Sequence, residues 1–182
     1  MKRFLKRKGR GGFSLAECLV ALLILSIMSM MACMGISNAV KDRAQAIVIA
    51  NAQTLASTAA QAVADQVRYG QIVQVDEDSI VLVSSTYGVR VRLGLDAQGH
   101  LVAQNVNDSM AAVGPSYALL GDKVYADLIL DSLKFDADVH ADEVDSVRIR
   151  LSVGSEPVAF MGAQANLWAL DYTVAPLNTY MA

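Results

Sequence analysis

The first feature of the hydrophobic pattern is a long apolar run that follows a basic start. The run extends from Phe13 to Ile36 and contains one charged residue, Glu17. As an α-helix it would rise about 36 Å, which is enough to cross a hydrocarbon core of roughly 30 Å. The run therefore predicts a membrane-spanning helix with one carboxylate about a turn from its start.

Beyond Ile36 the pattern changes to a single apolar stripe with helical spacing. Apolar residues recur every three or four positions as far as Val67, and polar side chains keep mostly to the other side. The pattern predicts that residues 37–70 form the amphipathic half of the same helix. We interpret Gly70 as its C-terminal cap. The stripe consists of Val40, Ala44, Val48, Ala52, Leu55, Ala59, Val63 and Val67.

From residue 71 onward the period changes from helical to two, which is typical of strands. Residues 71–182 therefore predict an antiparallel β-sheet that forms an outward globular domain with residues 37–70. A long helix followed only by strands predicts an α+β fold. The expected strands are 72–75, 80–83, 89–95, 100–106, 124–135 and 144–153, with one or two edge strands in 158–174 and a surface loop at 107–123.

Charge divides the chain into a basic leader and an acidic remainder. Six lysines and arginines lie within residues 1–12, and their loss would change the formal net charge from −3 to −9. Positive residues flanking a span stay in the cytoplasm, so the remainder is expected to face outward. An acidic mature surface does not indicate DNA binding.

The carboxylate of Glu17 requires an explanation, because charge inside a membrane segment is unfavourable and usually functional. Cleavage between Gly12 and Phe13 would create an α-ammonium group on Phe13, four residues from Glu17 and on the same helix face. The amine of this chain or of a neighbouring chain could then pair with the acid.

The leader, Gly12, the segment Phe13-Ser14-Leu15 and Glu17 at the fifth position after the cut resemble the N-terminal signature of type IV prepilins and pseudopilins. The resemblance implies the pilin fold, cleavage by a prepilin peptidase after Gly12 and N-methylation of Phe13. It also implies filament assembly in which Glu17 meets the terminal amine of an adjacent subunit. The implied partners are other pilin or pseudopilin subunits, a membrane assembly platform and the lipid of the cytoplasmic membrane.

The expected function is that of a structural subunit in a type IV pilus, a type II secretion system or a DNA-uptake filament. Ala16, Cys18 and Met34 depart from the usual family residues, which favours a minor subunit. We expect a single-pass protein of the inner membrane with its C-terminal domain outside, which joins an extracellular filament on assembly.

Two other classes of protein fit the same start. Met30-Met31-Ala32-Cys33 follows an apolar segment, so lipidation of Cys33 would make a lipoprotein. Without cleavage, the chain would be a single-pass membrane protein with an outward binding or sensor domain. Cys18 and Cys33 are the only cysteines and are too far apart on one helix for a disulfide, so we interpret them as packing residues.

The sequence shows no convincing catalytic, cofactor or metal site, and we expect no enzyme activity. Residues 136–145 alternate carboxylates around His140, but Ala141 and Val147 break the EF-hand pattern. We interpret this segment as a solvated turn, with calcium binding left open. Two arginine pairs, Arg90 with Arg92 and Arg148 with Arg150, would form a basic patch if their strands were neighbours.

Overall fold

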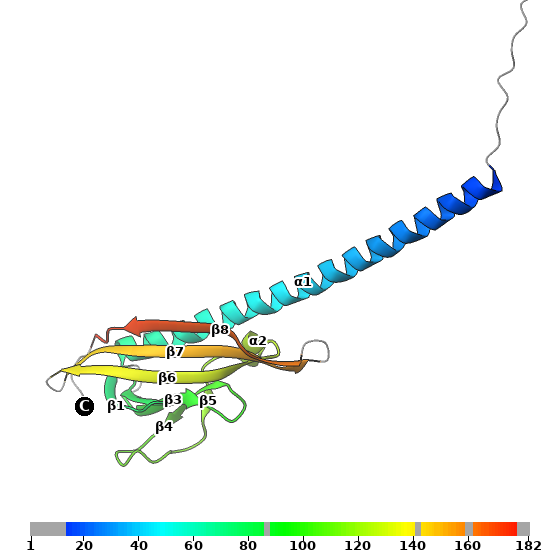
Figure 1. Ribbon diagram of the computed structural model, residues 1–182. Helices are drawn as coiled ribbons and strands as arrows, with labels where there is room; N and C mark the ends of the chain where they lie inside the picture. The colour runs from blue at the N-terminus through cyan, green and yellow to red at the C-terminus, as the bar shows by residue number, and fades with distance from the viewer. Residues whose placement is uncertain (1–13, 86–87, 141–142, 159–161, 178–182) are drawn as a thin grey trace, which may run out of the picture. The chain divides into compact units, whose positions relative to one another are not determined.

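The computed structural model describes residues 14–85, 88–140, 143–158 and 162–177 (Figure 1). The predicted leader, with Gly12 and Phe13, lies outside the described residues. The chain divides into two compact units, residues 1–46 and residues 47–182.

A single helix, α1 (Leu15–Tyr69), begins in the first unit and ends in the second. This confirms the continuous helix predicted from the two apolar patterns. Gly70 does not form the expected glycine cap, because such a cap has positive φ and Gly70 is not among the residues with positive φ. A Cβ there would lie 2.7 Å from the carbonyl oxygen of Gln66 and 2.9 Å from Cδ1 of Leu82, so glycine is required by close approach.

The first five strands form one antiparallel sheet in sequence order. The predicted hairpin between residues 72–75 and 80–83 is confirmed, as are the two strands that follow it. Alternation of buried and partly exposed residues along these strands explains why period two predicted them. The strands are β1 (Gln71–Val75), β2 (Ile80–Val83), β3 (Arg90–Leu95), β4 (Leu101–Asn105) and β5 (Tyr117–Ala118).

The last three strands form a separate antiparallel sheet, so the single predicted sheet is in fact two. They are β6 (Leu128–His140), β7 (Glu143–Val158) and β8 (Gly162–Val174). The predicted pairing of the first two is confirmed, with Phe135 opposite Ile149. The expected acidic turn was placed too early, because residues 136–140 continue β6 and pair with β7.

The segment predicted as an irregular loop at 107–123 contains β5 and leads into a short helix, α2 (Asp122–Tyr125). The strand predicted from residue 124 therefore begins later, at Leu128, after Ala126 and Asp127 take up positive φ. The helix places Tyr125 in the core, where its Oη accepts a hydrogen bond of 2.7 Å from the Leu101 N–H.

One hydrophobic core joins α1 to both sheets within residues 47–182. The helix contributes small and β-branched residues, which allow the strands to approach closely. On β7 the predicted inward residues are all buried, while Arg148 and Arg150 are exposed as predicted. The buried helix residues are Ala52, Leu55, Ala56, Ala59, Ala60, Val63 and Val67.

Backbone hydrogen bonds tie the two sheets together at the outer edge of β6. The Leu130 N–H donates to the Gly99 carbonyl at 3.0 Å, and the Phe135 N–H donates to the Glu77 carbonyl at 2.9 Å. At the opposite edge of the three-stranded sheet, the Tyr172 Oη in β8 donates to the Ala60 carbonyl of α1 at 2.8 Å. These three bonds fix the positions of β6 and β8 around the common core.

Candidate functional site

The first half of α1 exposes nearly all of its apolar side chains. Leucines, isoleucines and methionines between Leu15 and Ile36 are about half exposed or more, from 48% at Ile27 to 82% at Leu15. The helix contains an 18-residue window with mean hydropathy 2.5 and none of it buried. By length and composition, α1 is the one helix in the described part of the chain that could cross a membrane. Water is a poor solvent for such a surface, so lipid or other helices must cover it.

The start of α1 is closed by reciprocal hydrogen bonds between Ser14 and Glu17. The Glu17 N–H donates to Ser14 Oγ at 3.2 Å, and the Ser14 N–H donates to Glu17 Oε2 at 2.9 Å. This is a capping box, in which two backbone donors at the helix start are each satisfied by a side chain. In a low-dielectric surrounding those donors would otherwise cost several kcal/mol, on the order of the penalty for any unsatisfied amide.

The capping box gives Glu17 a structural role that the sequence interpretation did not assign. A Ser-x-x-Glu pattern directly before an apolar run is a readable signature of it, and Ser14-Leu15-Ala16-Glu17 has that pattern. The box also holds the carboxylate at the positive end of the helix dipole. The Ser14 N–H belongs to the Phe13–Ser14 peptide bond, so cleavage before Phe13 would leave both hydrogen bonds possible.

The other residues singled out in the apolar run lie along the same helix without a common site. Cys18 and Cys33 are exposed, unpaired thiols. The predicted cleavage and methylation positions, Gly12 and Phe13, fall outside the described residues, so the pairing of a Phe13 amine with Glu17 stays a prediction.

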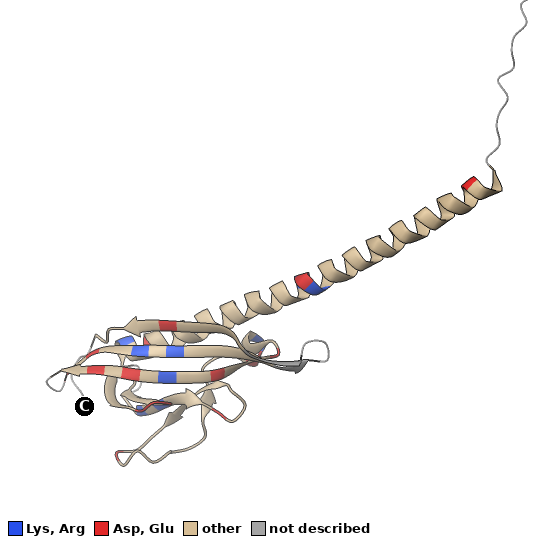
Figure 2. Ribbon diagram, viewed as in Figure 1, with Lys and Arg blue, Asp and Glu red and all other residues tan. Residues whose placement is uncertain are grey.

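The two arginine pairs do not form a joint basic patch. Arg90 lies on β3 and Arg148 on β7, in different sheets. One arginine of each pair has an acidic partner: Arg90 pairs with Asp108 at 3.1 Å, and Arg148 pairs with Asp171 at 2.6 Å. Figure 2 shows the cations of β7 between acidic residues of β6 and β8, as expected for the polar face of a sheet.

Ion pairs on this polar face shift the pKa values of their members. The hydrogen bond from Arg148 lowers the pKa of Asp171, and the same contact raises the pKa of Arg148. The hydrogen bond from Lys134 likewise lowers the pKa of Glu77. At the hairpin between β6 and β7, Nδ1 of His140 lies 3.5 Å from Asp138 and 3.6 Å from Asp145. In the described residues no group of three or more His, Cys, Asp or Glu side chains has the geometry of a metal site.

Comparison with known families matches residues 7–32 to the prokaryotic N-terminal methylation motif. Together with the long apolar helix that begins inside it, this motif fits a type IV pilin-like protein. The motif implies processing by a prepilin peptidase and assembly with other pilin subunits. No curated protein and no solved structure matches the chain.

Proposed function

We propose that this protein is a structural subunit of a pilin-like filament, with a minor pilin or pseudopilin role. The observation that carries the proposal is the apolar, exposed first half of α1, which is closed at its start by the Ser14–Glu17 capping box inside the methylation motif. A helix of this kind serves both as an anchor in lipid and as a packing surface for other helices.

In this proposal the basic leader stays in the cytoplasm and the peptidase cuts after Gly12. Phe13 then carries the new amine and its methyl group. The capping box holds the Glu17 carboxylate near the helix start, where an ammonium group from an adjacent subunit can reach it. The globular unit lies outside the membrane. It supplies contacts rather than catalysis, so the role is structural and not enzymatic.

The rival classes predict different N-termini. A lipoprotein would begin at a lipidated Cys33, inside a helix that here runs unbroken from Leu15 to Tyr69. A membrane-anchored sensor would keep Met1. The intact helix on both sides of Cys33 favours the pilin-like class over the lipoprotein.

The N-terminus is tested by intact mass of the membrane-extracted protein from cells that contain a prepilin peptidase. We expect a chain that starts at Phe13 and carries one additional methyl group. A chain that keeps the whole leader, or one that begins with a lipid on Cys33, would refute the proposal.

The role of the charge is tested by Glu17→Gln, because glutamine can also close a capping box while it carries no charge. We expect membrane anchoring to persist and incorporation into sheared filaments to fall by about tenfold or more, since loss of a charge pair at low dielectric costs on the order of one to several kcal/mol. Ser14→Ala is the matched control, because it weakens the capping box and keeps the charge.

Wild-type incorporation of Glu17→Gln would show that the charge is not needed. Equal defects in Glu17→Gln and Ser14→Ala would assign the effect to the helix start instead of the ion pair.

A further inference from the structure

The outer edge of β6 has unused backbone groups beyond Phe135. β6 lies at the edge of the three-stranded sheet, and the Phe135 N–H points away from β7 toward Glu77. The register shifts in β6 fall between Leu130 and Ser132 and after Asp138, so Ala137 points its N–H and C=O the same way as Phe135. Within the described part of the chain, no backbone group outside β7 bonds to Ala137.

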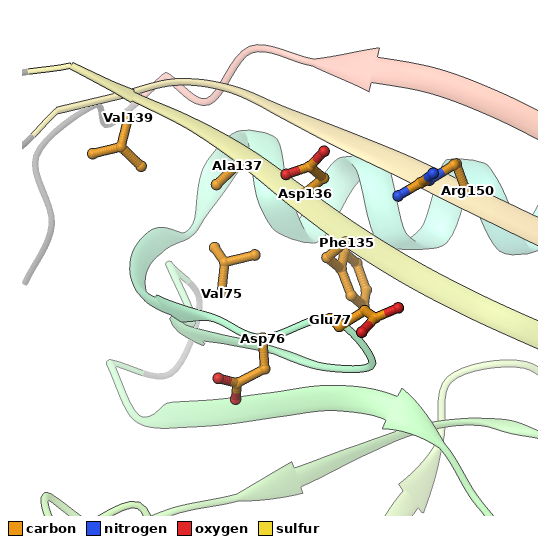
Figure 3. Close-up of a pocket in the computed structure, with 8 residues that line it drawn as sticks. All are labelled: Val75, Asp76, Glu77, Phe135, Asp136, Ala137, Val139 and Arg150. Atoms are coloured by element: carbon orange, nitrogen blue, oxygen red, sulfur yellow. The ribbon is translucent and has the colours of Figure 1, made fainter.

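An open pocket with a volume of about 500 Å³ lies at this edge, between β6 and the turn that follows β1 (Figure 3). On the apolar side of the pocket, the side chains of β6 become more exposed toward the end of the strand. Phe135 is 3% exposed, while Val139, four residues further along β6, is 44% exposed. Val75 and Ala137 are half-buried beside them. An apolar side chain placed here would complete the inner face of the sheet.

The rest of the pocket lining is charged and mostly acidic. Asp76, Glu77 and Asp136 contribute carboxylates, against one guanidinium from Arg150. Glu77 is already paired with Lys134, and Asp76 accepts hydrogen bonds from the side chains of Gln74 and Ser79. Among the described residues, Asp136 lies opposite Arg148 in the β6–β7 pair, and Arg148 directs its side-chain hydrogen bonds to Asp171 instead of Asp136. The pocket touches both faces of β6, since Ala137 and Asp136 point to opposite sides of the strand.

We propose that this edge of β6 binds an extended, basic segment of another protein as an added strand. The backbone of that segment would pair with Ala137. Its side chains would alternate between an apolar residue over Val75 and Val139 and a lysine or arginine beside Asp136. A pocket that wraps both faces of one edge strand fits an added strand, because such a strand presents side chains to both faces.

Charge argues for another protein and against a second copy of this chain. Of the 18 acidic residues, all except Glu17 and Asp42 lie in residues 47–182, against seven of the 15 basic residues. A second copy would bring mainly like charge to an acidic edge. The inference rests on β6 and the pocket at its edge, and it does not depend on how the N-terminus is processed.

The test uses the full chain in neutral detergent and a labelled, end-capped nonapeptide of alternating valine and lysine. We expect saturable binding that weakens with salt. A valine and glutamate peptide should not bind. A valine and lysine peptide with N-methyl groups on alternate amides should lose about tenfold or more in affinity, because it keeps the charge but cannot pair as a strand.

Variants locate the site on the protein. Asp136→Asn and Ala137→Pro should each lower the affinity about tenfold, the second without breaking the pairing with β7 because the lost N–H points outward. Asp127→Asn is the control for general charge, since Asp127 is exposed, lies outside the pocket and has φ 66°, which asparagine tolerates. An unchanged melting temperature shows that each variant is folded.

The proposal would be overturned if the N-methylated peptide bound as tightly as the unmodified one. It would also be overturned if Asp136→Asn and Asp127→Asn bound the peptide with the same affinity. Absence of binding at millimolar peptide would overturn it as well. Self-association of the full chain that the peptide displaces would overturn the choice of another protein as the partner.

Discussion

Two glycines with similar backbone conformations face very different surroundings. Gly99 has φ 76° and Gly114 has φ 80°. A Cβ on Gly99 would lie 2.9 Å from the Leu130 carbonyl oxygen, whereas a Cβ on Gly114 would meet nothing within 4 Å. Gly99 therefore allows a turn at positive φ and also lies at a contact between the two sheets.

Alanine at these two positions separates backbone strain from contact. Gly114→Ala should cost about 1–2 kcal/mol of unfolding free energy from positive φ alone. Gly99→Ala should cost about 0.5–1.5 kcal/mol more, because it also disturbs the hydrogen bond from Leu130. Denaturant unfolding of both variants measures the difference, and equal losses would show that the link between the sheets contributes nothing at this point.

Some residue roles were readable from the sequence and others were not. The Ser14–Glu17 capping box follows from a four-residue pattern. The role of Tyr125 does not, because its hydroxyl group bonds the Leu101 N–H across 24 residues of chain. Only the folded arrangement of α2 against β4 brings these two groups together.

Among the elements, those with a clear period were predicted and those without one were missed. Helix α1 and the strands up to β4 repeat their pattern over enough residues to be recognised. The four-residue α2 and the two-residue β5 each hold about one period of their pattern, so the pattern has no repeat to recognise. The division into two sheets depends on contacts such as that between Gly99 and Leu130, which local patterns do not encode.

The ion pair between β7 and β8 predicts a pH effect with a definite sign. Arg148 holds the pKa of Asp171 below its ordinary value, so the pair stabilises the fold above the ordinary carboxyl range and is lost as the pH falls through the lowered pKa. The difference in melting temperature between wild type and Asp171→Asn should therefore shrink from pH 7 to about pH 3.

Both side chains of this pair are about half exposed, so salt should weaken the effect at neutral pH. Glu77→Gln offers a second carboxylate with a pKa lowered in the same way, in that case by Lys134. A difference in melting temperature that stays constant from pH 7 to pH 3 would contradict the assignment.

For the whole molecule, the core predicts where the chain can be divided. Every buried residue of the hydrophobic core lies between Ala52 and Val174, and the compact second unit begins at Ile47. A fragment of residues 47–182 should fold without the apolar half of α1. Circular dichroism should show helix and strand with cooperative unfolding.

The fragment contains no cysteine, so a reducing agent should leave its melting temperature unchanged. A fragment from residue 71 is the control, because it lacks the helix residues of the core and should not unfold cooperatively. A disordered spectrum for residues 47–182 would mean that the first half of α1 is needed for folding.

The bond between Tyr172 and Ala60 spans 112 residues of chain, and this separation sets the order of events during synthesis. The alanine-rich face of α1 is made early, whereas β8 is made last. At a ribosome speed of about 5–20 residues per second, the interval is on the order of ten seconds. Native contacts with such long separation also form slowly once both partners exist. For that time the incomplete chain exposes the apolar face of α1 that β8 later covers, so rapid synthesis should favour aggregation of nascent chains.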